Sequence, residues 1–156
     1  MKSGLRPTFL LIRPMDMLKN TIKNLIPDDL VMIDYNDFSQ AGKFKIIIDS
    51  SKGIDLNTTS LLAKKIKKSN VINDRFPNGI EIEISSPGID ADLIHPVQYK
   101  KNIGRTLKIK ISDNLEIKEV KLSATDDNGI EGILQNGQKI NLKYSQIENA
   151  KVIVKF

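Results

Sequence analysis

The spacing of apolar residues changes near residue 87, and this change most constrains what the chain can fold into. Before it, apolar residues recur at helical spacing in two segments and form three short extended ones. After it, short alternating segments follow one another, separated by turn residues. These two patterns of apolar residues predict two domains. We expect an N-terminal extension at 1–14, a first domain at 15–94 and a second at 95–156.

The first domain is predicted to hold two helices and three strands. Apolar residues from Leu18 to Ile26 predict one helix, which Pro27 ends, and a second helix is expected at 61–69 after a cap at Asp55 or Asn57. A crossover from the second strand to the third would place both helices on one face of the sheet. This is a two-layer α/β unit whose strands are expected at 30–35, 43–49 and 80–84.

The second domain is predicted to be a small β-barrel of the SH3 or Sm type. One helical turn is expected at 97–102, ahead of five short strands joined by tight turns. The pairs Asn128-Gly129 and Asn136-Gly137 are expected to supply the positive φ angles of tight hairpins. The fold class is therefore α+β, with the barrel strands at 106–111, 117–124, 130–135, 138–142 and 151–154.

Composition favours a cytoplasmic binding protein over an enzyme. The chain has no cysteine and one histidine, which excludes disulfides and thiolate metal sites and leaves few acid–base groups. Its longest apolar runs have four residues, so no membrane segment is expected. The net charge of +5 suggests a polyanionic partner. We expect no catalytic residue, no metal and no cofactor, and we interpret Asp90, Asp92 and His95 as linker residues.

A specific motif lies where the spacing of apolar residues changes. It reads Glu83-Ile84-Ser85-Ser86-Pro87-Gly88-Ile89-Asp90, followed by Tyr99-Lys100-Lys101-Asn102-Ile103-Gly104-Arg105. From about residue 15 onwards, the chain resembles the ribosome maturation factor RimP family. The resemblance implies an SH3-like second domain, no catalytic reaction, and a role in maturing the small ribosomal subunit through contact with a small-subunit ribosomal protein. Ala91-Asp92 stands where that family usually has Arg-Pro, so the role of that arginine is not carried over.

The same motif predicts an inter-domain hinge. Pro87 and Gly88 stand where the middle of a type II turn requires them, and Gly88 would take the positive φ. We assign the hinge to Ser85, Ser86, Pro87 and Gly88.

Basic residues gather at the start of the second domain. Residues 97–110 contain five cations and no acidic residue. They could form an edge that contacts phosphates, or they could be solvated lysines that discourage edge pairing. The family resemblance favours the first interpretation. The ribosome- and RNA-binding residues are therefore predicted to be Lys100, Lys101, Arg105, Lys108 and Lys110, whereas the lysines of the second helix, Lys64, Lys65, Lys67 and Lys68, are expected to be mainly solvated.

Two functions from different classes remain. In the first, a monomeric assembly factor binds immature small subunits: its barrel binds a ribosomal protein, partly through an exposed strand edge, and its cations hold ribosomal RNA. In the second, a stand-alone Sm-like module binds messenger or small RNA. The scarcity of aromatic residues disfavours the second, because such modules stack bases on aromatic rings. Tyr99 and Tyr144 are expected to be the most available of them.

Overall fold

The computed structural model describes residues 14–154 and divides into two units. Of the described residues, the first unit comprises 14–48 and 55–85, and the second comprises 49–54 and 86–154. The predicted extension at 1–14 lies outside the described residues except for Pro14, which begins the first helix.

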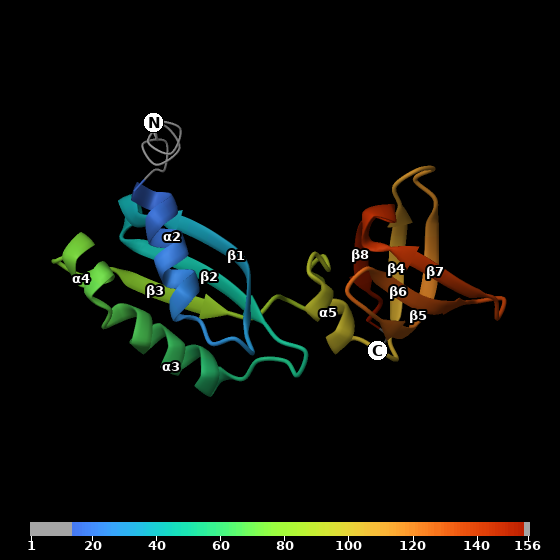
Figure 1. Cartoon of the computed structure of the whole chain (residues 1–156), viewed down its shortest axis with the longest axis horizontal. Coiled ribbons are helices and arrows are strands. Elements are labelled where there is room, and N and C mark those ends of the chain that lie inside the picture. Colours follow the sequence, from blue (N-terminus) through green and yellow to red (C-terminus); the bar gives the residue numbers. More distant parts are fainter. Residues whose placement is uncertain (1–13, 155–156) are drawn as a thin grey trace, which may run out of the picture. The chain divides into compact units, whose positions relative to one another are not determined.

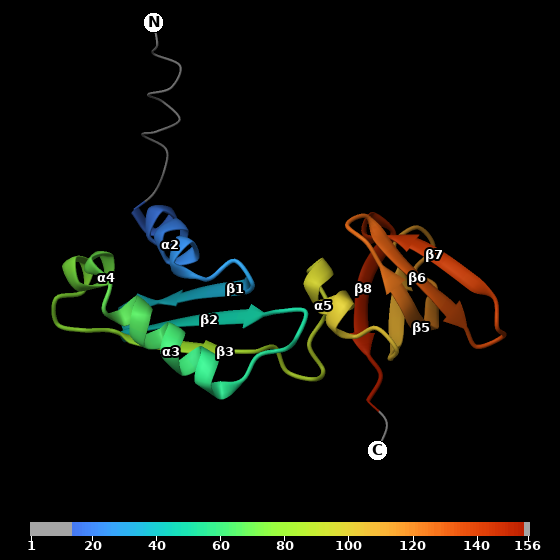
Figure 2. The same ribbon diagram turned by 60° about the horizontal axis from the view of Figure 1, so that its bottom comes forward.

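The first unit is a three-stranded sheet with helices packed on it (Figure 1). Its strands lie in the order β1-β2-β3, where β1 and β2 run in opposite directions (Figure 2) and β2 pairs with β3 in parallel. A short 3-10 turn joins β1 to β2. In chain order the elements are α2 (Pro14–Leu25), β1 (Val31–Phe38), η1 (Ser39–Ala41), β2 (Lys43–Asp49), α3 (Leu56–Lys67), α4 (Asn70–Arg75) and β3 (Glu81–Ser85).

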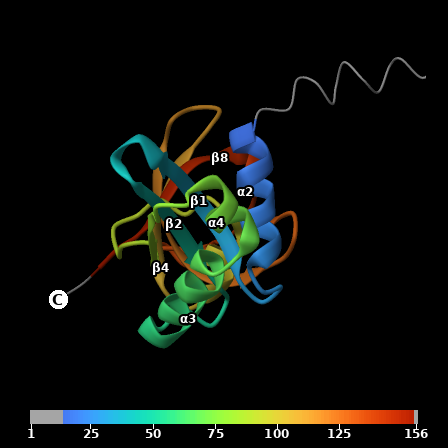
Figure 3. The same cartoon turned by 90° about the vertical axis from the view of Figure 1, so that its left-hand side faces the viewer.

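The core of this unit follows from the alternation along β2. Phe44, Ile46 and Ile48 have no exposed surface, because they share the face that α2 and α3 cover. The two helices also contact each other (Figure 3). Each helix buries its apolar side, and Ile22 of α2 and Ile66 of α3 have no exposed surface.

The second helix begins earlier than predicted, and a further helix follows it. Asp55 caps α3, since its carboxylate accepts a hydrogen bond of 2.7 Å from the backbone N–H of Thr58. Hydrogen bonding from Thr58 lowers the pKa of the Asp55 carboxyl. The unpredicted helix α4 is only one and a half turns long, and it buries a single side chain, Ile72. A segment this short has too few apolar positions to display helical periodicity.

The second unit contains a short helix and a five-stranded antiparallel sheet in the order β7-β6-β5-β4-β8. Five strands are found where five were predicted, but the last begins earlier than expected, since polar residues interrupt its apolar pattern. The chain is thus of the α+β class. The elements are α5 (Pro96–Lys101), β4 (Thr106–Ile111), β5 (Ile117–Thr125), β6 (Gly129–Leu134), β7 (Lys139–Lys143), η2 (Tyr144–Gln146) and β8 (Ile147–Val152).

Two of the glycine predictions fail for a local reason. Gly137 has the expected positive φ of 86°, whereas neither Gly129 nor Gly88 has a positive φ. In the turn that contains Gly129, the Asp126 carboxylate accepts hydrogen bonds from the N–H groups of Asn128 and Gly129, at 2.7 and 2.9 Å, and so fixes the shape of the turn. Glycine is still required at 129, because a Cβ there would overlap the carbonyl oxygen of Leu142.

The turn at the predicted hinge is displaced by two residues along the chain. The N–H of Ala91 donates to the carbonyl of Gly88 at 3.1 Å, so Ile89 and Asp90 occupy the centre of the turn. The prediction of a type II turn centred on Pro87 and Gly88 is therefore wrong.

Within residues 14–154, no helix has the length and apolar character needed to cross a bilayer.

Candidate functional site

The helix α5 carries two of the predicted basic residues and is held by an extensive N-terminal cap. His95 accepts a hydrogen bond at Nδ1 from the N–H of Val97 at 3.1 Å, so it is a capping residue rather than a free linker side chain. Gln98 reaches back and accepts from the N–H groups of Ile94 and His95, at 2.8 and 3.0 Å. This cap fixes the direction in which the last turn of α5 presents Lys100 and Lys101.

Two of the five predicted cations have acidic partners. The Nζ of Lys101 lies 2.9 Å from Oδ2 of Asp49, whose side chain is only 1% exposed. Asp49 is the last residue of β2 but belongs to the second unit, so this ion pair lies within the second unit. Lys110 lies 3.3 Å from a carboxylate oxygen of Glu148, and both of these side chains are well exposed. Lys101 is thus committed to neutralising a buried carboxylate, whereas the exposed Lys110 pair is weak and easily exchanged.

The other three cations are exposed, and no ion pair among the described residues involves them. They are Lys100, Arg105 and Lys108. Arg105 lines a cavity of about 160 Å³ together with Lys101 and the predicted hinge residues Pro87 and Gly88. Lys108 lines a different hollow of about 660 Å³ with Ile117 and Leu134. The structure therefore brings Lys101 and Arg105 together beside the predicted hinge and places Lys108 at a second location.

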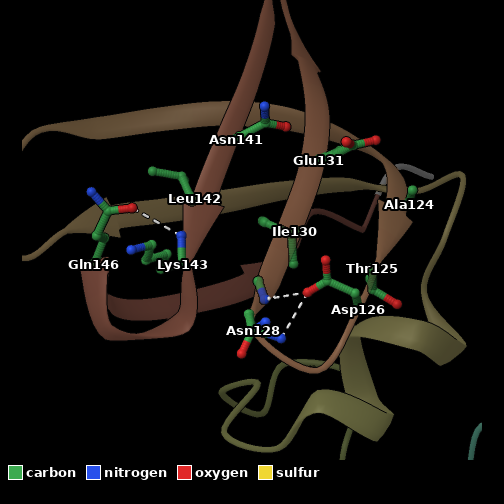
Figure 4. Close-up of a pocket in the computed structure, with 11 residues that line it drawn as sticks. Ala124, Thr125, Asp126, Asn128, Ile130, Glu131, Asn141, Leu142, Lys143 and Gln146 are labelled. Atoms are coloured by element: carbon green, nitrogen blue, oxygen red, sulfur yellow. Dashed lines mark hydrogen bonds between the residues drawn. The ribbon is translucent and has the colours of Figure 1, made fainter.

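Sequence reasoning missed a hollow on the second unit, of about 510 Å³, that both polar and apolar residues line (Figure 4). Asp126, Glu131 and Asn141 line it, and Glu131 lies opposite Asn141 in the pairing of β6 with β7. Gln146 accepts a hydrogen bond of 2.9 Å from the N–H of Lys143 and so supports one wall. These residues come from separate segments, and only the alternation of polar residues on β6 and β7 indicates that they share a face.

The tyrosines expected to be available for base stacking are packed instead. Tyr99 is 3% exposed, and its ring centroid lies 5.1 Å from that of Tyr144. The Tyr99 hydroxyl donates to the carbonyl of Leu93 at 3.3 Å, and the Tyr144 hydroxyl donates to that of Asp126 at 3.0 Å. Burial raises the pKa of both phenols above their usual range. The expectation that Tyr99 is exposed is wrong.

Comparison with known proteins identifies the family. A family model for the RimP N-terminal domain matches residues 20–90. The ribosome maturation factor RimP of Christiangramia forsetii is 30% identical over 133 residues, which cover 77% of this chain and 84% of that protein. The chain belongs to the RimP family. The resemblance predicted from the motif at 83–90 and its continuation at 99–105 is thus confirmed.

In this RimP-family chain, Ala91-Asp92 stands where the resemblance leads one to expect an Arg-Pro pair, and the segment that contains it contacts β8. The Asp92 carboxylate lies 3.7 Å from Nζ of Lys151 on β8. The N–H of the next residue, Leu93, donates to the carbonyl of Ala150 at 2.8 Å. The segment after the predicted hinge therefore occupies part of the outer edge of β8, whereas β7 ends the sheet on its other side.

Proposed function

We propose that this chain is a non-catalytic maturation factor of the small ribosomal subunit. In this proposal it acts as a cytoplasmic monomer, binds immature subunits, and leaves when the mature surface no longer fits it. Membership of the RimP family is the single observation that carries the proposal. The two units then supply separate surfaces, and the second supplies the main contact.

Ribosomal RNA would be held by the exposed cations at the start of the second unit. Lys100, Arg105 and Lys108 lie within nine residues and have no acidic partner in the described ion pairs, so their charges are available to phosphates. Lys110 could join them by exchanging Glu148 for a phosphate, because an exposed ion pair is worth little. Lys101 would contribute less, since leaving Asp49 would strand a buried carboxylate.

A small-subunit ribosomal protein would bind at the free edge of β7. We interpret the five-stranded sheet as an SH3-like barrel, in which β8 is partly covered by Leu93 and β7 is open to strand addition. The hollow of Figure 4 lies beside this edge and carries Asp126 and Glu131. Proteins that bind RNA are rich in lysine and arginine. An extended basic segment of such a protein would pair with β7 and reach these carboxylates.

Co-sedimentation tests this function. The protein is mixed at matched salt with immature small subunits, with mature small subunits and with free ribosomal RNA. We expect it to sediment preferentially with immature subunits. Equal or stronger association with free RNA would contradict the proposal and support the alternative, a stand-alone Sm-like module. The packing of Tyr99 and Tyr144 against each other speaks against that alternative, because it removes two of the chain's eight aromatic rings from base stacking.

A further inference from the structure

The first unit has a groove between α3 and β3 that the proposed function does not use. Its volume is about 660 Å³. One wall is formed by Ser60, Ala63, Lys64 and Lys67 of α3, and the other by the chain from Asn78 to Ile82. Figures 1 and 2 show α3 running alongside β3, and the two elements are in contact.

The strand that borders this groove has a free edge. The N–H of Glu81 donates to the carbonyl of Gly42 at 2.9 Å, so the backbone groups of Glu81 face β2. Backbone groups alternate in direction along a strand, and those of Ile82 and Ile84 therefore face away from β2. Because β3 ends the sheet, these groups have no backbone partner within the described part of the chain. Such an edge is a template for an added strand.

The walls of the groove suit an extended chain. Ser60 and Ala63 are small, so they leave room between the helix and the strand. Ile80 is buried and Ile82 half-buried, and they give the groove an apolar side. Side chains of an added strand alternate between the two faces of the sheet, so every second one would point toward α3.

The charge of the groove selects the chemistry of its occupant. Lys64 and Lys67 are exposed, and no ion pair of the described residues involves either of them. Glu81 is the single acidic residue among those that line the groove. A carboxylate of the bound segment would therefore meet uncompensated ammonium groups. A second copy of this chain is a poor occupant, since pairing two β3 edges would bring the two sets of lysines together.

We propose that this groove binds an extended, acidic segment of a partner protein, which adds to the sheet as a fourth strand next to β3. The segment pairs with the free backbone groups of Ile82 and Ile84. Its small apolar side chains lie against Ala63 and Ile82, and its acidic side chains contact Lys64 and Lys67. This inference is independent of the ribosomal role, because it concerns a different unit and a different kind of ligand.

The test uses the full chain labelled with ¹⁵N and a ten-residue peptide that alternates valine with glutamate. We expect the peptide to slow hydrogen exchange of the Ile82 and Ile84 amides at least about tenfold, because free-edge amides become hydrogen-bonded. A proline at the centre of the peptide should abolish this protection, since proline cannot donate to a ladder. A peptide that alternates valine with lysine should bind more weakly. No added protection at Ile82 and Ile84 at saturating peptide would overturn the proposal.

Matched variants separate the groove from general surface charge. The double substitution Lys64→Glu/Lys67→Glu should weaken binding of the glutamate peptide by about tenfold, which corresponds to about 1.4 kcal/mol. Lys65→Glu/Lys68→Glu makes the same charge change on the same stretch of chain but outside the groove, and it should weaken binding less than about threefold. Equal losses in the two variants would overturn the proposal in favour of unspecific attraction.

A third variant tests the shape of the groove without changing its charge. Ala63→Leu fills the space between α3 and β3 and should also abolish peptide binding, while circular dichroism confirms that the helix is retained. An oligouridine probe addresses the remaining class of partner. If it bound at this groove and the glutamate peptide did not, the proposed acidic segment would be wrong.

Discussion

The ring of Tyr35 lies nearly parallel to that of Phe44, with their centroids 5.7 Å apart and an angle of 29° between the planes. Phe44 in turn meets Phe76 edge-on at 5.4 Å. The hydroxyl of Tyr35 is buried and has no hydrogen-bond partner in the described part of the chain. Burial raises the pKa of this phenol to about 12. The aromatic cluster of the first unit thus contains a buried polar group that makes no hydrogen bond within the described part of the chain.

The first prediction concerns this hydroxyl. Tyr35→Phe keeps the stacking on Phe44 and removes an unsatisfied polar atom, so the free energy of unfolding should stay the same or rise by about 1 kcal/mol. Tyr35→Ala, as the control, removes the ring and should lower it by about 2–4 kcal/mol. Urea unfolding followed by circular dichroism measures both. A loss of more than about 1 kcal/mol in Tyr35→Phe would mean that the hydroxyl has a partner.

The second prediction concerns alkaline pH. Burial raises the pKa of all three tyrosines, Tyr35, Tyr99 and Tyr144. In the folded protein, phenolate absorbance at 295 nm should therefore appear at a higher pH than in urea, where it should appear near about pH 10. Each raised pKa favours the folded state fully below the unfolded value, and this contribution is lost as the pH rises through the folded value. If all three tyrosines of the folded protein titrated near pH 10, this result would contradict the burial of their side chains.

The third prediction separates the structural role of Lys101 from RNA binding. Lys101→Met leaves the buried Asp49 carboxylate without its counter-ion and should lower the free energy of unfolding by up to about 3 kcal/mol. Adding Asp49→Asn removes the stranded charge and should restore much of the loss, as thermal unfolding would reveal. If the single variant were as stable as the parent protein, Lys101 would be available to phosphates after all.

The fourth prediction concerns the cations proposed to contact RNA. Replacing Lys100, Arg105 and Lys108 by glutamate should weaken binding to immature small subunits. Each lost phosphate contact should also lower the slope of log affinity against log salt by about 0.7–0.9. The fold should persist, because exposed substitutions change stability by only about 0.5 kcal/mol each.

The control for the fourth prediction is the same change at Lys64, Lys67 and Lys68, which lie in another unit and should affect subunit binding less. An unchanged affinity and salt slope in the Lys100, Arg105 and Lys108 variant would show that these cations are only solvated. Recognition would then have to depend on the uncharged surface of the sheet.

The amino-acid sequence by itself determined the elements whose burial is one-sided and local. The strands at 43–49 and 106–111 coincide with β2 and β4, because alternate burial on one face leaves a period of two in the sequence. The positive φ of Gly137 follows likewise from an Asn-Gly pair between two short strands. The motif at 83–90 and its continuation at 99–105 are specific enough to indicate the family, because together they combine a Ser-Ser-Pro-Gly segment with the start of a second domain.

Tertiary structure alone decided which polar and aromatic residues are available. In the sequence, Lys101 is one of five similar cations. In the structure, it is paired with Asp49, which is 52 positions away in the sequence. The sequence predicts that the Tyr99 ring is exposed. In the structure, the ring packs on Tyr144 and the hydroxyl donates a hydrogen bond to the carbonyl of Leu93. Hydrophobic periodicity reports the face on which a side chain lies, whereas its partners depend on which distant segment the fold brings opposite that face. That pairing has no local signature, so only the three-dimensional structure determines it.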